Sequence, residues 1–421
     1  MGLIAEWLTQ ELQRHPVPLR VMLRLLDKLT PDAINGRVAI KSDAVREVFE
    51  RPDEFLMGYL NAPKLKLGNF LLGMDPGPTH AHEKALLKAA LASSLGEFPT
   101  IVAYESEIAA RRVADSARAS GKLELVTEFV EPPFVRSLAQ YFGIPVRGLR
   151  CDAIDTAPGD RTLAMIIRKL GGTIASSHPA PFGLEALATR VAGPFKAHLR
   201  EAVRRHRDGT ILERMEPAPA GRAALAPERS VIGQLLAHAA FPDGDEGVVR
   251  SVGGMLSASA GFPKAFAHVL HELLKRPHEL KIFAQAARAS DEATLHAYVR
   301  EALRFRPVFP ILVRYCPHAA AMHSAPATVP AQTTLPLFPL GAMFDPARVV
   351  EPERFMPGRP ENVYALFGGG PRVCIGQPLI MQLFLPTFRA LLTALPELLD
   401  AKPGRLVYDG AVIASYELRL P

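Results

Sequence analysis

The sequence predicts a mainly α-helical protein with a few small β-sheets. Apolar residues recur at three- and four-residue spacing over long stretches, which is the period of an amphipathic helix. Alternating β-prone stretches are short and few, and the last two flank Asp409-Gly410, a typical hairpin turn. No repeat or shift in composition divides the 421 residues, so we expect a single domain, residues 1–421.

The helical period is clearest in residues 80–95, 101–118, 122–143, 190–206, 248–275, 293–305 and 376–394. The β-prone stretches are residues 36–40, 311–315, 333–338, 406–408 and 412–418. Residues 217–221 are rich in proline and alanine and predict a surface loop between helices. The order of these elements predicts small sheets near one edge of a helical core.

The composition favours a folded, soluble protein of the cytoplasm. Hydrophobic residues make up 48% of the chain and charged residues 22%, which allows a large core and excludes a disordered class. The net charge of +6 is scattered, so we expect no nucleic-acid partner; the basic residues fit a solvated surface or a docking face for an acidic redox protein. Cys151, Cys316 and Cys374 are widely separated, which fits a reducing compartment. The N-terminus contains no apolar run long enough to span a bilayer, so we expect no transmembrane segment.

One segment carries the chemistry: residues 367–376 read Phe-Gly-Gly-Gly-Pro-Arg-Val-Cys-Ile-Gly and precede a predicted helix. Consecutive glycines let the backbone turn tightly and approach a flat object without Cβ clashes. Cys374 lies just before the helix, where backbone N–H groups stabilise a thiolate. Arg372 can pair with an anionic group on that object. A buried structural cysteine is the much weaker alternative.

The pattern Phe-x-x-Gly-x-Arg-x-Cys-x-Gly resembles the haem loop of the cytochrome P450 family. The resemblance implies the P450 fold, with helices A–L around a buried haem b, and Cys374 as the ligand of its iron. Phe367 and Gly376 begin and end the motif and are expected to lie against the cofactor.

Two further motifs agree with the family in order and spacing. Glu301-Ala302-Leu303-Arg304, about 70 residues ahead of Cys374, resembles the ExxR motif of helix K. Pro352-Glu353-Arg354-Phe355 resembles the motif whose arginine completes a buried Glu–Arg–Arg network. The resemblance assigns Glu301, Arg304 and Arg354 to support of the fold and the haem loop, with Arg359 as the alternative third member.

The same resemblance implies partners for the haem propionates. His80 lies in a segment similar to the start of helix C, although a plain surface histidine is the alternative. Lys84 stands where the family commonly has arginine, so the charge is kept but the bidentate fork is lost. Arg314, in the strand after helix K, and Arg372 complete the set.

Helix I departs from the family pattern. This helix should cross the distal face of the haem and carry an adjacent acid and alcohol that relay protons. Counting back from Pro277 puts Ala260 and Gly261 in those places, and the segment between Glu246 and Glu272 contains neither a carboxylate nor a threonine. Ser259 is the nearest hydroxyl, and Pro263 should kink the helix. Ser259, Ala260 and Gly261 are therefore the candidate catalytic positions.

This departure leaves three functions open. The protein is expected to be an O2-dependent monooxygenase supplied by ferredoxin and ferredoxin reductase, with protons from water, Ser259 or the substrate. A peroxygenase or fatty-acid hydroperoxide isomerase or dehydratase is the alternative, because such branches often lack the acid–alcohol pair. Lys264 could hold a fatty-acid carboxylate for them, but a surface lysine is the favoured interpretation. A non-catalytic haem-binding module is the third.

The expected pocket walls are apolar, which favours a hydrophobic small-molecule substrate. By resemblance they include residues 60–72 between helices B and C, and the side chains Met255, Phe262, Val308, Phe309, Ile311 and Val412. Ordinary core packing is an equally good interpretation for any one of them. We expect a monomer.

Overall fold

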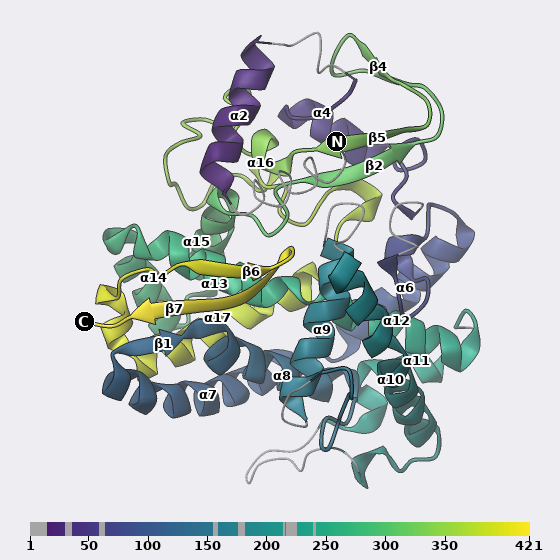
Figure 1. Ribbon diagram of the computed structural model, residues 1–421, viewed down its shortest axis with the longest axis vertical. Helices are drawn as coiled ribbons and strands as arrows, with labels where there is room; N and C mark the ends of the chain where they lie inside the picture. Colours follow the sequence, from purple (N-terminus) through teal and green to yellow (C-terminus); the bar gives the residue numbers. More distant parts are fainter. Residues whose placement is uncertain are drawn as a thin grey trace.

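The computed structural model describes residues 15–29, 36–58, 64–154, 159–175, 182–213, 215, 225–238 and 241–421. A large helical part carries the chain's core, and a smaller part combines helices with two small sheets (Figure 1). The C-terminal hairpin lies across the helical part beside α13 (Figure 1). The mainly α-helical class with small sheets is confirmed.

The helices are α2 (Pro16–Leu29), α4 (Ser42–Glu50), α6 (Pro78–Ser93), α7 (Phe98–Ser120), α8 (Glu131–Phe142), α9 (Asp160–Ala175), α10 (Phe182–Arg207), α11 (Val231–Ala237), α12 (Gly244–Ala258), α13 (Gly261–Leu274), α14 (Pro277–Ala289), α15 (Glu292–Phe305), α16 (Pro339–Ala342) and α17 (Gln377–Ala394). Several boundaries follow from local chemistry. Gly121 and Gly143 end α7 and α8 in the left-handed conformation, and Asp291 caps α15 by accepting from the Thr294 N–H.

The strands of the described ranges form three small antiparallel sheets. β1 (Lys122–Glu124), β7 (Val412–Arg419) and β6 (Leu406–Asp409) pair in that order; β2 (Leu312–Cys316) pairs with β5 (Thr333–Leu337), and β3 (Ala320–Met322) with β4 (Ala327–Val329). The predicted hairpin is present, with Gly410 at φ +61° and Asp409 paired to Val412. Its turn reaches the middle of the molecule.

Three predicted elements differ. Residues 122–143 are not one helix, because 122–124 pair with β7 and a π-helical turn, η3 (Leu125–Val130), precedes α8. Residues 36–40 form only an isolated bridge, Ala39 to Leu337. Residues 248–275 are two helices, α12 and α13, separated at residues 259–260. Pro263 lies in the first turn of α13, where a missing N–H costs little.

The core fixes where α17 begins. α17 packs on α7, α14 and α15. Its Phe384 and Phe388 are buried against Phe266, which stacks on Phe388 with ring centroids 3.9 Å apart. Because Cys374 lies just before Gln377, the first residue of α17, this aromatic packing anchors the loop that carries the thiol.

No single helix in the described ranges has both the length and the apolar composition to cross a membrane. α6 and α7 pass that test only as a pair, and they meet at a 62° bend.

Candidate active site

The glycines before Cys374 are required by contacts with α4. Gly368 and Gly370 have φ of +75° and +59°, in the region that favours glycine. A Cβ on Gly370 would lie 2.4 Å from the Phe49 carbonyl oxygen, and one on Gly369 would lie 2.9 Å from the Phe49 ring. Close packing of the loop on α4 therefore explains why Gly369 and Gly370 are glycines. This reason could not be predicted from the sequence.

Cys374 lies at the base of this loop. Its backbone N–H donates to the Phe367 carbonyl at 3.0 Å, and Gly376 lies directly beside its sulfur, so the two ends of the motif meet here. The side chain is exposed, yet protein atoms crowd it and this desolvation raises the pKa of the thiol. The N–H groups of Gly376 and Gln377 and the charge of Lys84 act in the opposite direction.

Basic groups gather around the same loop. The Arg372 guanidinium donates to the carbonyls of Leu71, at 3.0 Å, and Met74, and lies 3.1 Å from the His80 Nε2. Lys84 donates to the Pro371 carbonyl. Burial, with the charge of Arg372, lowers the pKa of Arg314 to about 10. Burial and the charges of Arg372 and Lys84 lower the pKa of His80 to about 4.

These basic groups have few carboxylate partners in the described residues. The nearest carboxylate to Arg372 is that of Asp75, at 3.7 Å, and the Arg372 Nε is buried with no partner among the described residues. Arg314 is buried and donates to the Val313 carbonyl at 2.8 Å. Buried cations are stable when paired, so this set fits a cofactor with carboxylate groups. A thiol at the base of the loop and arginines with few carboxylate partners beside it fit haem.

The buried Glu–Arg–Arg network is present with a different third member. Glu301 and Arg304 are fully buried and form a bidentate pair at 2.8 and 2.9 Å. Arg359 completes it, with its Nε 3.3 Å from Glu301 and its other nitrogens on the carbonyls of Val350, Glu351 and Arg354. The assignment of Arg354 is wrong, because its side chain is 65% exposed and pairs with Glu351. Only its carbonyl contributes, accepting from Arg304 and Arg359.

The break between α12 and α13 holds the three candidate catalytic positions. The Ser259 hydroxyl donates to the Leu256 carbonyl at 2.6 Å, so its proton is engaged in the helix. Ala260 is buried, and a Cβ on Gly261 would lie 3.4 Å from Val308 and 3.9 Å from the Phe309 ring. The break thus packs against Val308 and Phe309, which precede β2 and were predicted to line the pocket.

Two small hollows adjoin this break. One is lined by Ala260, Pro263, Val412 and Ile413 together with residues of α8 and α9. The other lies between α9, Gly254 and Ser257 of α12, and residues 64–70 of the predicted B–C segment. Leu60 to Pro63 of that segment lie outside the described residues.

Two expected pocket residues pack elsewhere. Phe262 is buried between Phe134 and Phe384, at centroid distances of 5.0 and 5.3 Å, so it belongs to the aromatic core. Ile311 packs against a separate apolar cluster around Leu340 and Phe344. Met255 is partly buried against the main core.

Lys264 is not a surface lysine. It is 3% exposed, and its Nζ donates to the carbonyls of Val308, at 2.7 Å, and Ala411, at 2.9 Å. Lys264 therefore links α13 to the segment before β2 and to the turn of the C-terminal hairpin. The preference for a snorkelling side chain is wrong because these two segments cover it.

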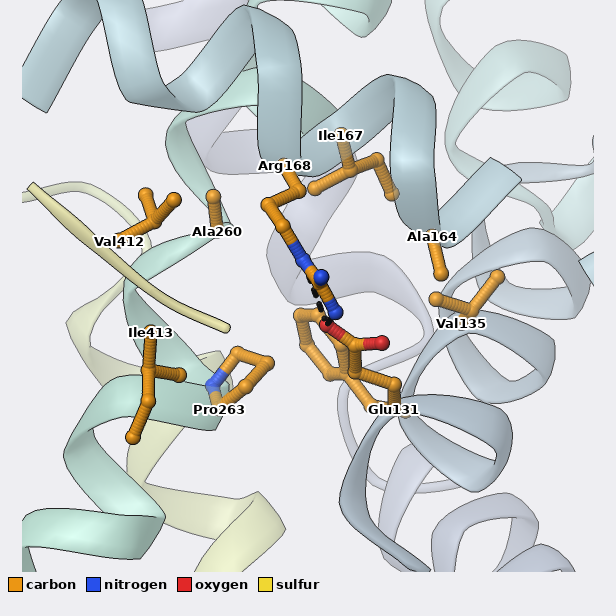
Figure 2. Close-up of a pocket in the computed structure, with 10 residues that line it drawn as sticks. Glu131, Val135, Ala164, Ile167, Arg168, Ala260, Pro263, Val412 and Ile413 are labelled. Carbon is orange, nitrogen blue, oxygen red and sulfur yellow. Dashed lines mark hydrogen bonds and ion pairs between the residues drawn. The ribbon is translucent and has the colours of Figure 1, made fainter. Parts of the chain in front are cut away.

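Glu131 and Arg168, which meet in the first hollow, were not predicted from the sequence. Figure 2 shows Glu131 of α8 and Arg168 of α9 pointing toward each other beside Ala260 and Pro263. Both side chains are about nine-tenths buried and form an ion pair. No motif marks them, because they come from different helices and meet only in the fold.

Comparison with known proteins identifies the family pattern in the C-terminal part. The family model described as Cytochrome P450 matches residues 290–393. The steroid 17-alpha-hydroxylase/17,20 lyase of Rattus norvegicus is 38% identical over 101 residues, covering 21% of this chain and 19% of that protein. The mitochondrial cytochrome P450 315a1 of Drosophila melanogaster is 30% identical over 134 residues, covering 29% and 25%. The chain thus spans about a fifth to a quarter of the length of these curated relatives.

The fold is similar to solved P450 structures over nearly the whole chain. P450BioI, in complex with hexadec-9Z-enoic acid ligated acyl carrier protein, matches with a TM-score of 0.73 at 15% identity, covering 97% of this chain and 99% of that one. CalO2 matches with a TM-score of 0.74 at 18% identity, covering 98% and 97%. CYP109E1 from Bacillus megaterium, in complex with testosterone, matches with a TM-score of 0.69 at 17% identity, covering 95% and 98%.

Proposed function

We propose that the chain is a haem-dependent protein of the cytochrome P450 family, an O2-dependent monooxygenase acting on a hydrophobic small molecule. The observation that carries the proposal is the joint placement of the Cys374 thiol and the anion-poor arginines around one loop. Bound haem supplies oxygen activation, and a thiolate ligand favours it. Ferredoxin is the proposed electron donor, in the cytoplasm.

The chain's own residues have distinct parts in this proposal. Cys374 ligates the iron as the thiolate, which the N–H groups at the start of α17 and the Lys84 charge stabilise. Arg314, Arg372 and His80 bind the propionates. Lys84 has three donors, of which one holds the loop through Pro371 and the others remain for a propionate.

The walls around the helix break favour an apolar substrate. Val308, Phe309 and Val412, which flank Ala260 and Gly261, are apolar. Apolar walls bind apolar substrates by excluding water, and a few polar groups set the orientation. Fatty acids and steroids are suitable probes because the solved relatives bind a hexadecenoyl chain and testosterone.

Peroxide-driven oxidation is the second candidate function. It is favoured by the residues at the break, since Ala260 and Gly261 supply neither acid nor alcohol and the Ser259 hydroxyl is engaged by the Leu256 carbonyl. A ready-made peroxide needs no delivery of protons for oxygen activation. The O2-dependent function is preferred as the general activity of the family.

One experiment separates the two functions. The haem-loaded protein is incubated with hexadec-9-enoic acid or testosterone, in one arm with ferredoxin, ferredoxin reductase, NADPH and O2, and in the other with hydrogen peroxide alone. We expect NADPH-dependent product in the first arm. Turnover confined to the peroxide arm would refute the monooxygenase and establish the second candidate.

The thiolate assignment has its own test. We expect the reduced carbon-monoxide complex to give the thiolate Soret band, and Cys374→Ala to abolish it. Cys151→Ala is the matched control, because Cys151 is also a free cysteine but lies buried in the main core. An unchanged spectrum in Cys374→Ala would overturn the assignment.

A further inference from the structure

The ion pair of Glu131 and Arg168 lies near Ala260, between α12 and α13, the segment expected to be helix I and to carry an acid at this position. Arg168 binds Glu131 through two nitrogens, and both contacts go to the same oxygen, Oε1. The pair lines the hollow that also contains Ala260, the residue in the expected acid position (Figure 2).

The hollow is suited to proton transfer through water. The hollow has free space for about one water molecule beside the carboxylate. Its other walls come from Phe134, Val135 and Ala164 on one side and from Pro263, Val412 and Ile413 on the other. None of these side chains competes with Glu131 for water or for a proton.

We propose that Glu131, held in place by Arg168, is the carboxylic acid that handles protons at the helix break, in place of an acid on helix I. The inference rests on the proposed O2-dependent function, in which substrate RH, O2, two electrons from ferredoxin and two protons yield ROH and water. Glu131 gives a proton to water in the hollow and regains one from bulk solvent. The carboxyl group is therefore unchanged after each turnover.

Burial and the charges around Glu131 act on its pKa in different directions. Burial is the largest influence and raises the pKa of Glu131, Arg168 opposes it, and Glu124 of β1 adds to the increase. The faces that α12, α13 and β7 turn to the hollow, at Ala260, Pro263, Val412 and Ile413, carry no charge. A carboxyl whose pKa lies above its ordinary value is better matched to proton transfer near neutral pH.

The test compares Glu131→Gln with Glu105→Gln. Glu105 is a matched control because it is a buried carboxylate paired with an arginine, Arg136 of α8 at 3.8 Å, and it does not line the hollow. In the haem-loaded protein with testosterone or hexadec-9-enoic acid, we expect Glu131→Gln to reduce ferredoxin-driven turnover about 100-fold, the lower end of general acid catalysis. Hydrogen-peroxide-driven turnover and the carbon-monoxide spectrum should persist, and Glu105→Gln should stay near wild type.

A second measurement follows protonation without turnover. Infrared titration of the holoprotein should show a carboxylic-acid C=O band with a midpoint above about 4.3, the ordinary glutamate value, and Glu131→Gln should lose it. A midpoint at or below that value would overturn the proposal.

Two turnover results would overturn it as well. One is unchanged ferredoxin-driven turnover in Glu131→Gln, which, if hexadec-9-enoic acid also binds more tightly, would make Arg168 a substrate anchor. The other is an equal loss in both arms, which indicates a structural role. A wild-type protein active only with peroxide refutes the monooxygenase itself. That outcome differs from failure of the Glu131 proposal alone, in which the wild type remains ferredoxin-driven.

Discussion

Replacing Arg359 with methionine should destabilise the protein far more than replacing Arg354. Arg359 donates from its Nε to the fully buried Glu301 and from its other nitrogens to three carbonyls, Val350, Glu351 and Arg354. Removing it leaves part of a buried carboxylate's charge uncompensated, and loss of one partner of a buried pair costs about 3–5 kcal/mol. Arg354 forms an exposed pair with Glu351, for which about 0–1 kcal/mol is expected.

These free energies convert to different shifts in melting temperature. An unfolding entropy of roughly 2.1 cal/mol/K per residue gives roughly 0.9 kcal/mol/K for a chain of 421 residues. A loss of about 4 kcal/mol then lowers Tm by about 4–5 °C, and Arg354→Met lowers it by at most about 1 °C. Circular dichroism of both haem-loaded variants, heated at the same rate, measures the difference. Equal shifts, or a larger one for Arg354→Met, would refute the placement of Arg359 in the network.

Three further predictions concern stability. Gly370→Ala should cost about 1–3 kcal/mol more than Gly121→Ala, because both glycines have positive φ but only a Cβ on Gly370 meets Phe49; urea midpoints compare them. Lys264→Met should cost about 2–3 kcal/mol in the same assay, since two buried carbonyls lose their donor. The pKa of Glu272 is lowered to about 2, because its neighbouring cations, Lys275 foremost, outweigh burial. The stabilisation of the fold by ionised Glu272 should therefore be complete above about pH 4.3 and be lost as the pH falls toward 2. The urea midpoints of Glu272→Gln and wild type should accordingly converge from pH 7 to pH 3.

The haem loop could be predicted because its requirements are local in sequence. The glycines, Arg372 and Cys374 lie within seven residues, and the helix that follows them shows clear periodicity. Glu301 and Arg304 are likewise three residues apart on one helix, and they pair as that spacing predicts.

The third member of the network could not be chosen from local pattern. Arg354 and Arg359 follow helix K in a segment without regular periodicity, so which one turns inward depends on how that segment folds back on Glu301. The same limit applies to residues 122–124. Their sequence has helical periodicity, but they form a strand because they pair with β7, which lies almost 300 positions later in the chain.

The distal side depends on such long-range contacts even more. A small residue at Ala260 leaves space that side chains from α8 and α9 occupy, and a carboxylate there would lie in the same hollow as Glu131. Two carboxylates sharing one arginine repel each other, which raises the pKa of one of them and weakens the ion pair. The absence of an acid on helix I and the presence of one on α8 are therefore mutually consistent. In this interpretation α8, rather than the segment between α12 and α13, supplies the acid. The break can then lack a carboxylate although the residues around Cys374 follow the family pattern.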